Sequence, residues 1–289
     1  MRTRMAILAV PLIVAACSGG AAPASRSPSL SATQSPRYAV ATGSDQQILR
    51  ISLEGGFTSP TYQLTRTPTL ALYGDGRVIV PGPTSDANPG PLLPDLHQER
   101  VTPAEIQTIV AAADAAGLLG PDASYGNPGV ADAPATVFAL TVAGTTHVIS
   151  AMALGGGMDG PDTQGVDQRA RLLAFENSMT NLSGLLGRTV SDDGPYQPAG
   201  YDVFSSEAEP DPTQPSIDWP LARDPGTAGA TTVVDGVRCL AVKGADLAPF
   251  LATARTASPT TIWKAASGKY SISVRPLYPD ESGCQATAG

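Results

Sequence analysis

The chain has 289 residues, 42% of them hydrophobic and 15% charged, which is enough for one large domain or two smaller ones with a buried core. Its 18 Lys and Arg residues are outnumbered by 26 Asp and Glu residues, so the formal net charge is −8. This excess of acid argues against binding to nucleic acid or to anionic lipid headgroups, whose phosphates attract basic proteins.

Residues 1–16 predict a signal peptide. Arg2 and Arg4 precede an apolar run over residues 5–16, and this run is too short to cross a bilayer as a permanent helix. Residues 14–17, Val-Ala-Ala-Cys, resemble the lipobox of bacterial lipoproteins. An ordinary signal peptide followed by an incidental cysteine is the alternative.

The lipobox resemblance implies that the thiol of Cys17 receives a diacylglyceryl group and that a dedicated peptidase cleaves before it. Two or three acyl chains anchor a protein firmly, because each buried CH₂ contributes about 0.8 kcal/mol. We therefore expect an extracytoplasmic protein, anchored through its lipid to the outer face of the cell membrane. The mature chain would hold 16 basic and 26 acidic residues, a net charge of −10, because Arg2 and Arg4 are removed.

Residues 17–37 combine the lipidated N-terminus with a stretch that is rich in Ser, Ala and Pro and has no apolar period. This composition predicts a disordered tether.

Cys239 and Cys284 remain if Cys17 carries lipid. An even pair in an oxidising compartment predicts a disulfide, which for a loop of this length would stabilise the fold by about 4 kcal/mol on the chain-entropy model. A redox pair or a thiol nucleophile is the alternative. Redox pairs usually lie close together in sequence, however, and a nucleophile needs a nearby base, so we expect a structural disulfide.

The first predicted elements are a hairpin and a helix. Residues 68–80 contain two apolar runs around Gly74-Asp75-Gly76, whose tolerance of positive φ suits a tight β-hairpin. Residues 102–105, Thr-Pro-Ala-Glu, form a capping box with Pro at the first helical position. An amphipathic helix over residues 103–116 is predicted to follow.

A second hairpin is predicted over residues 135–152, where two strand-like runs flank Ala143-Gly144. Apolar residues at helical spacing then predict the longest helix over residues 166–186. The first half therefore has the order ββαββ.

A cluster of Pro residues between residues 210 and 225 predicts a loop or a boundary. Residues 231–242 are β-rich around an Asp-Gly, and the apolar stripe that begins at Leu247 predicts a helix with Pro249 in its first turn. Residues 261–277 predict a closing hairpin. The second half also has the order ββαββ.

These elements predict an α+β fold of antiparallel β-hairpins with packed helices. We expect an α+β unit over residues 38–190, a Pro-rich connection over residues 191–230, and a smaller α+β unit with the disulfide over residues 231–289. The shared order raises the alternative of two ββαββ units related as a pseudo-repeat, although the two halves do not visibly align.

Residues 155–160, Gly-Gly-Gly-Met-Asp-Gly, match the pattern G-x-G-x-x-G of dinucleotide-binding loops. Such a site needs a parallel βαβ unit and a helix that begins at the loop. Here the preceding strand is predicted to lie in an antiparallel hairpin, and the following helix begins several residues late. We expect a flexible glycine loop and no cofactor.

No local hydrolase motif is present: the sequence lacks G-x-S-x-G, S-x-x-K and H-E-x-x-H. The two histidines, His97 and His147, are expected to be surface or hydrogen-bonded side chains. The acidic residues of the glycine-rich segment offer oxygen ligands for calcium but lack EF-hand spacing, so solvation and helix capping are preferred for them. These residues are Asp159, Asp162 and Asp167. We assign no catalytic residue and no metal site.

The most distinctive motif is Arg-Pro-Leu-Tyr-Pro-Asp-Glu at residues 275–281. From about residue 237 to 284 the sequence resembles uncharacterised actinobacterial lipoproteins that end in W…Y…RPLLPDE…C, and it departs from them at Tyr278, where those proteins have Leu. The resemblance implies an envelope location and pairing of Cys239 with Cys284. It implies no activity.

Within this motif, Arg275 is expected to pair with Asp280 or Glu281 and to stabilise the fold. A binding motif is the alternative.

Taken together, these features favour a non-enzymatic binding or envelope-scaffolding role, with an unknown envelope protein or small ligand as partner and no nucleic acid. One alternative is an extracytoplasmic hydrolase whose catalytic residues come from distant positions. Another is a carrier of a lipid or other apolar ligand, which requires a large apolar cavity.

Overall fold

The computed structural model describes residues 37–83, 85–156, 160, 163–209 and 211–284. The fold is α+β, as predicted, and both sheets belong to one compact unit. No helix in these residues combines the length and apolar character needed to cross a bilayer. In chain order the elements are β1 (Gln47–Gly55), α1 (Pro60–Thr65), β2 (Leu70–Tyr73), β3 (Arg77–Pro81), β4 (Leu96–Arg100), α2 (Pro103–Ala115), β5 (Ala123–Tyr125), β6 (Pro134–Val142), β7 (Thr145–Met152), α3 (Val166–Met179), α4 (Leu182–Leu186), β8 (Ser191–Pro195), β9 (Gly200–Glu207), β10 (Ser216–Asp218), β11 (Ala230–Thr231), β12 (Arg238–Lys243), the 3₁₀ turn η1 (Gly244–Asp246), α5 (Leu247–Ala254), β13 (Ile262–Ala265) and β14 (Gly268–Pro276).

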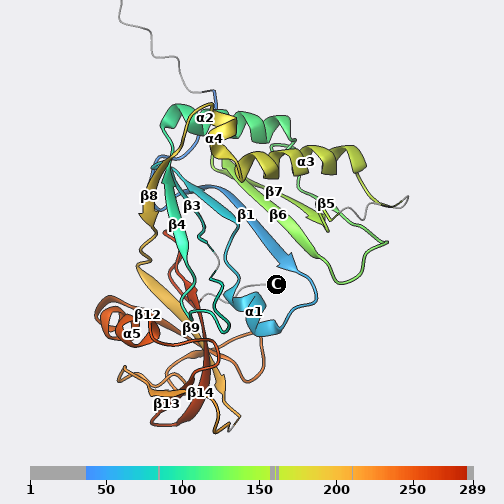
Figure 1. Ribbon diagram of the computed structural model, residues 1–289. Helices are drawn as coiled ribbons and strands as arrows, with labels where there is room; N and C mark the ends of the chain where they lie inside the picture. The colour runs from blue at the N-terminus through green and yellow to red at the C-terminus, as the bar shows by residue number, and fades with distance from the viewer. Residues whose placement is uncertain (1–36, 84, 157–159, 161–162, 210, 285–289) are drawn as a thin grey trace, which may run out of the picture. The chain divides into compact units, whose positions relative to one another are not determined.

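The first sheet has the strand order β5-β7-β6-β1-β2-β3-β4-β8 in the described residues. Helices α2 and α3 lie along one face of it (Figure 1). Apolar side chains recur on one side of β6 and on one stripe of each helix, so burying these faces against each other forms the main core. Members of that core include Ile51, Ile109, Phe138, Leu172 and Phe175.

Both predicted hairpins of this sheet are confirmed. β2 and β3 pair across Gly74-Asp75-Gly76, and β6 and β7 pair across Ala143-Gly144. The structure adds strands that the sequence patterns did not reveal, above all β1, which lies between β6 and β2.

The helix predicted over residues 166–186 is interrupted. α3 ends with Thr180 as its C-cap, and α4 begins after Asn181, whose side chain accepts a hydrogen bond from the amide of Gly184 at 3.0 Å. Thr and Asn are poor helix formers, and Asn is a good N-cap, so these two residues end one helix and start another.

The second sheet has the strand order β10-β13-β14-β9-β12-β11 in the described residues. The hairpin expected over residues 261–277 is confirmed as β13 and β14, and Pro249 lies in the first turn of α5 as predicted. The core of this sheet includes Trp263, Phe250 and Val203.

The segment expected to be a Pro-rich connection, residues 191–230, contributes to both sheets. β8 pairs with β4 in the first sheet, while β9 lies between β14 and β12 in the second. The strand β9 was hidden by its polar residues, because Asp202 and Ser205 are buried and bonded to backbone groups. The structure therefore gives this segment a larger role than a connection.

The capping box that begins α2 is present. The Thr102 side chain accepts a hydrogen bond from the amide of Glu105, and the Glu105 carboxylate accepts one from the amide of Thr102. Arg188 donates two further hydrogen bonds to the same carboxylate at 2.5 and 2.6 Å, which ties the segment before β8 to α2. The hydrogen bonds from Arg188 and from the Thr102 amide lower the pKa of Glu105 to about 2.

This depressed pKa predicts an acid-dependent loss of stability. The stabilisation is complete above the ordinary pKa of 4.5 and is lost as the pH falls toward about 2, because the carboxylate becomes protonated. Glu105→Gln should therefore lower the free energy of unfolding near neutral pH, and the difference from wild type should shrink toward zero at about pH 2. Urea unfolding over this pH range measures it. The control is Glu209→Gln at an exposed position, and a pH-independent difference for Glu105→Gln would contradict the assignment.

Candidate functional site

The C-terminal tail, residues 277–284, contacts both sheets. Tyr278 is buried against side chains of β2, β3 and β4, on the face of the first sheet that carries Ala71, Tyr73 and Ile79. The Tyr73 hydroxyl donates a hydrogen bond to Asp280 at 2.6 Å, and the Tyr196 hydroxyl donates one to the carbonyl of Leu277 at 3.0 Å. Burial raises the pKa of Tyr196 to about 12, so this hydroxyl stays protonated as a donor.

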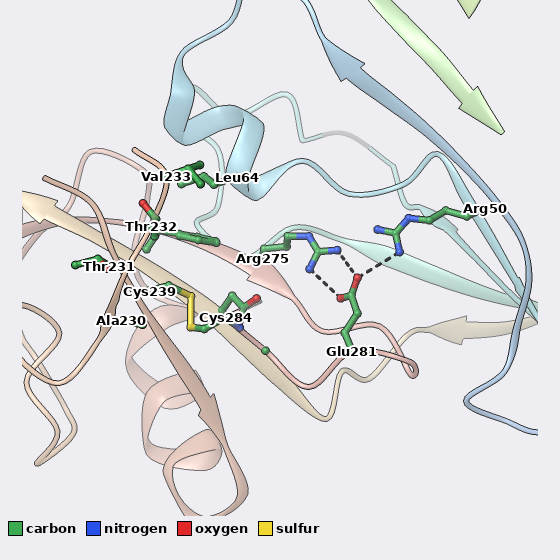
Figure 2. Close-up of a pocket in the computed structure, with 13 residues that line it drawn as sticks. Arg50, Leu64, Ala230, Thr231, Thr232, Val233, Cys239, Arg275, Glu281 and Cys284 are labelled. Atoms are coloured by element: carbon green, nitrogen blue, oxygen red, sulfur yellow. Dashed lines mark hydrogen bonds and ion pairs between the residues drawn. A yellow bond between two sulfur atoms is a disulfide. The ribbon is translucent and has the colours of Figure 1, made fainter. Parts of the chain in front are cut away.

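Glu281, a residue of this tail, is the centre of an ion cluster with two Arg side chains. Arg275 of β14 donates two hydrogen bonds to the Glu281 carboxylate, at 2.8 and 2.6 Å, and Arg50 of β1 approaches it at 3.3 Å. Arg275 and Arg50 both point toward the carboxylate of Glu281 (Figure 2). Burial alone would raise the pKa of Glu281, but hydrogen bonds from Arg275 and its charge outweigh burial and lower that pKa. The cluster thus joins a strand of each sheet.

The expected pairing of Arg275 is therefore confirmed for Glu281. Asp280, the other partner considered, instead accepts the hydrogen bond from Tyr73. Arg50 could not be assigned from sequence, because it lies 231 positions before Glu281 and no local pattern marks it.

The predicted disulfide is confirmed. Cys239 of β12 and Cys284 at the end of the tail are bonded, with their Cα atoms 5.6 Å apart. The backbone amide of Cys284 donates a hydrogen bond to Asp202 at 2.7 Å, and burial raises the pKa of Asp202. A carboxylate oxygen of Asp202 and both sulfurs lie within 4.8 Å of one another, but the sulfurs are bonded to each other and are not thiolate ligands.

Two adjoining cavities, which we call the junction groove, open beside the ion cluster. One has a volume of about 390 Å³ and is lined by the disulfide, Asp202 and β11, and the other has a volume of about 500 Å³ and is lined by α1 and the end of β1. Residues from both sheets and from α1 line the two cavities together. These shared residues are Arg50, Leu64, Val233 and Arg275 (Figure 2).

One exposed apolar side chain lines the junction groove, and two more lie in the chain segment that supplies part of its lining. Five large apolar side chains are exposed in the described part of the chain, and these three are among them. Val233 lines the groove and is 69% exposed, Phe57 lies in the loop between the lining residues Gly55 and Pro60, and Tyr62 lies on α1 beneath the guanidinium of Arg66. Such a grouping is typical of a binding surface.

The groove also offers a partly free cation. Arg275 is 11% exposed and fully engaged with Glu281, and Arg66 donates to backbone carbonyls of the β1 end. The side chain of Arg50 is 24% exposed; among the described residues it makes one side-chain hydrogen bond, the 3.3 Å contact with Glu281, and lies over the ring of Tyr278 at 5.7 Å from its centroid. Its remaining N–H groups are therefore available to an anionic group in the groove.

The other residues considered from sequence lie elsewhere. Cys17, Asp159 and Asp162 fall outside the described residues, and Asp167 lies in the first turn of α3. The glycine-rich segment follows β7, which pairs in antiparallel fashion with β6, as expected from the predicted hairpin.

Neither histidine lines the junction groove. The His97 ring nitrogens lie 3.7 Å from Asp95 and 3.8 Å from Asp192, beyond hydrogen-bonding distance. His147 Nδ1 lies 2.9 Å from the carbonyl oxygen of Gly120, a bond to backbone.

Comparisons of the chain with protein-family models, with curated proteins and with solved structures found no match. A functional assignment therefore rests on the residues of the groove and their chemistry.

The ion cluster yields a stability prediction. Glu281→Ala leaves Arg275 buried without its counter-charge, which typically costs about 3–5 kcal/mol. Lys264→Ala, which breaks the exposed pair with Asp218, is the control and should cost at most about 1 kcal/mol. Urea unfolding of the two variants measures the difference, and a similar small loss for both would show that the Glu281 cluster does not hold the tail.

Proposed function

We propose that the protein is an extracytoplasmic lipoprotein, anchored to the membrane through Cys17, that binds a partner protein of the cell envelope with its junction groove. The observation that carries the proposal is the exposed side chain of Val233 in a groove lined by Arg50, with the exposed side chains of Phe57 and Tyr62 in the neighbouring segment 55–66. Aromatic and Arg side chains are enriched at the energetic centres of protein interfaces. The role that we propose is therefore binding or scaffolding.

The partner should offer an anionic group beside apolar surface. The part of the groove next to α1 is lined by three Arg residues and one acidic residue, Glu54, although the chain as a whole is acidic. An anion on the partner would bind the remaining N–H groups of Arg50, while apolar side chains of the partner would cover Val233.

Two alternatives from the sequence are less well supported. A hydrolase with a His-containing triad would place that histidine among the polar groups of a cleft, whereas His97 and His147 lie outside the groove. A carrier of a wholly apolar ligand would need a mostly apolar wall, whereas four charged residues line each cavity of the groove.

Lipidation of Cys17 is tested by mass spectrometry. Protein extracted from the membranes of its native host should begin at Cys17 and carry the added mass of acyl chains. Cys17→Ser should leave an uncleaved, unlipidated precursor. A wild-type protein that keeps residues 1–16, or that is cleaved without lipid, would contradict the anchor.

The docking site is tested by photo-crosslinking in intact cells. A photoreactive benzoylphenylalanine at Val233 should form a discrete adduct with an envelope protein, and Arg50→Ala should reduce that adduct. The same probe at Val166, which is 54% exposed but outside the groove, is the matched control.

The fold of each photo-crosslinking variant is verified by far-ultraviolet circular dichroism, which reports on both sheets, and by tryptophan fluorescence, which reports on the second sheet. Equal adducts from Val233 and Val166, or an adduct that Arg50→Ala leaves unchanged, would contradict docking in the groove.

A further inference from the structure

A separate cavity of about 460 Å³ opens where the predicted long helix is interrupted. Its floor comes from the helix-facing side of β1 to β4, and its walls come from the end of α3 and the start of α4. The apolar lining includes Ile51, Leu70, Met179 and Leu182. We call it the carboxylate cavity, because Glu99 and Glu176 also line it.

The two carboxylates have no counter-charge there. Neither Glu99 nor Glu176 makes a side-chain hydrogen bond or ion pair with any described residue, and no Lys or Arg lines the cavity. Glu99 lies directly across the ladder from Asp192, so a third carboxylate adds negative charge nearby, and His97 is the nearby group that opposes it.

The pKa shifts of both carboxyl groups agree with this geometry. Burial, and for Glu99 also the charge of Asp192, raises the pKa of each carboxyl group above its ordinary value. A half-buried carboxylate is destabilised when no cation or donor compensates for its lost hydration. A cation placed in the cavity would supply that compensation.

We propose that the carboxylate cavity is a binding site for an amphiphilic organic cation, in which the carboxylates that line it, Glu99 and Glu176, attract a protonated amine and an apolar body contacts Leu70 and Met179. The apolar half of the lining favours an alkyl or aromatic amine over a hydrated metal ion, since calcium prefers several carboxylate ligands and the cavity offers two carboxylates beside the weaker oxygen donors Thr69, Thr180, Asn181 and Ser183. The site is distinct from the junction groove and does not depend on the function proposed for it.

The test uses the full chain in lipid nanodiscs, labelled with ¹³C at its methionine methyl groups. Met179 lines the cavity and reports binding, while Met152 on β7 lies outside it and is the internal control. Hexylamine, hexanol and hexanoate serve as matched probes that differ in charge. Hexylamine should shift the Met179 signal saturably and leave Met152 unchanged, and the neutral and anionic probes should bind at least about tenfold more weakly.

Two variants distinguish a site that prefers cations from an apolar cavity that does not depend on the charge of the ligand. Glu99→Gln and Glu176→Gln keep side-chain shape, and each should weaken hexylamine binding by about tenfold, as expected when a charge-assisted hydrogen bond is lost. The control Glu209→Gln should bind like wild type, which also corrects for partition of the amine into lipid. Unchanged signal dispersion establishes that each variant is folded.

Three results would overturn the proposal. Hexanol binding as well as hexylamine would show an apolar cavity without cation preference. Hexylamine binding that survives both Glu→Gln changes would place the amine elsewhere. Absence of a Met179 shift with hexylamine, or displacement of the bound amine by calcium, would exclude an organic-cation site.

Discussion

The largely buried carboxylate of Glu281, whose side chain is 15% exposed, is the constraint on which the arrangement of the junction depends. A charge removed from water is tolerated only when other groups replace its hydration, and Glu281 obtains this from Arg275, Arg50 and the amide of Tyr278. Because Arg275 lies on β14 and Arg50 on β1, satisfying one carboxylate brings a strand of each sheet to the same place. The aromatic ring of Tyr278 can then be buried against the first sheet.

The disulfide fixes the end of the same tail at Cys284. Cys284 is bonded to Cys239 on β12, and its amide is held by Asp202 on β9. With Tyr278 in the first sheet and Cys284 on the second, the tail contacts both cores within a few residues. The junction groove is the space left beside this crossing. A binding surface built on two sheets is thereby held in place by groups that are not themselves exposed, as pre-organised sites generally require.

Features set by local chemistry could be predicted from sequence, and features set by distant contacts could not. The capping box at Thr102 and the turn at Gly74-Asp75-Gly76 act within a few residues, so their patterns are readable. The strand β1 escaped notice because a register shift between Gln47 and Leu49 disturbs the two-residue alternation. In β9 the buried side chain of Asp202 breaks the apolar pattern.

The candidate sites show the same difference between local features, which could be predicted, and features that depend on distant contacts. The disulfide followed from the count of cysteines and the expected compartment, and Arg275 could be paired with a nearby acid. The groove and the carboxylate cavity were not foreseen, because they depend on residues that are distant in sequence: Arg50 contacts Glu281, and Glu99 of β4 and Glu176 of α3 line the same cavity. The interruption of the helix at Asn181, beside which the carboxylate cavity opens, was not predicted. Apolar residues at helical spacing continue on both sides of Asn181, so the sequence pattern indicated one continuous helix.

The tail couples the two sheets into one cooperative structure. Trp263 lies in the core of the second sheet and Trp219 packs against it; since these are the only tryptophans in the chain, their fluorescence reports on that sheet alone. Amide hydrogen exchange in β1 and β6 reports on the first sheet. In urea, both signals should therefore change in a single coincident transition. Separate transitions, with one sheet unfolding while the other stays intact, would contradict it.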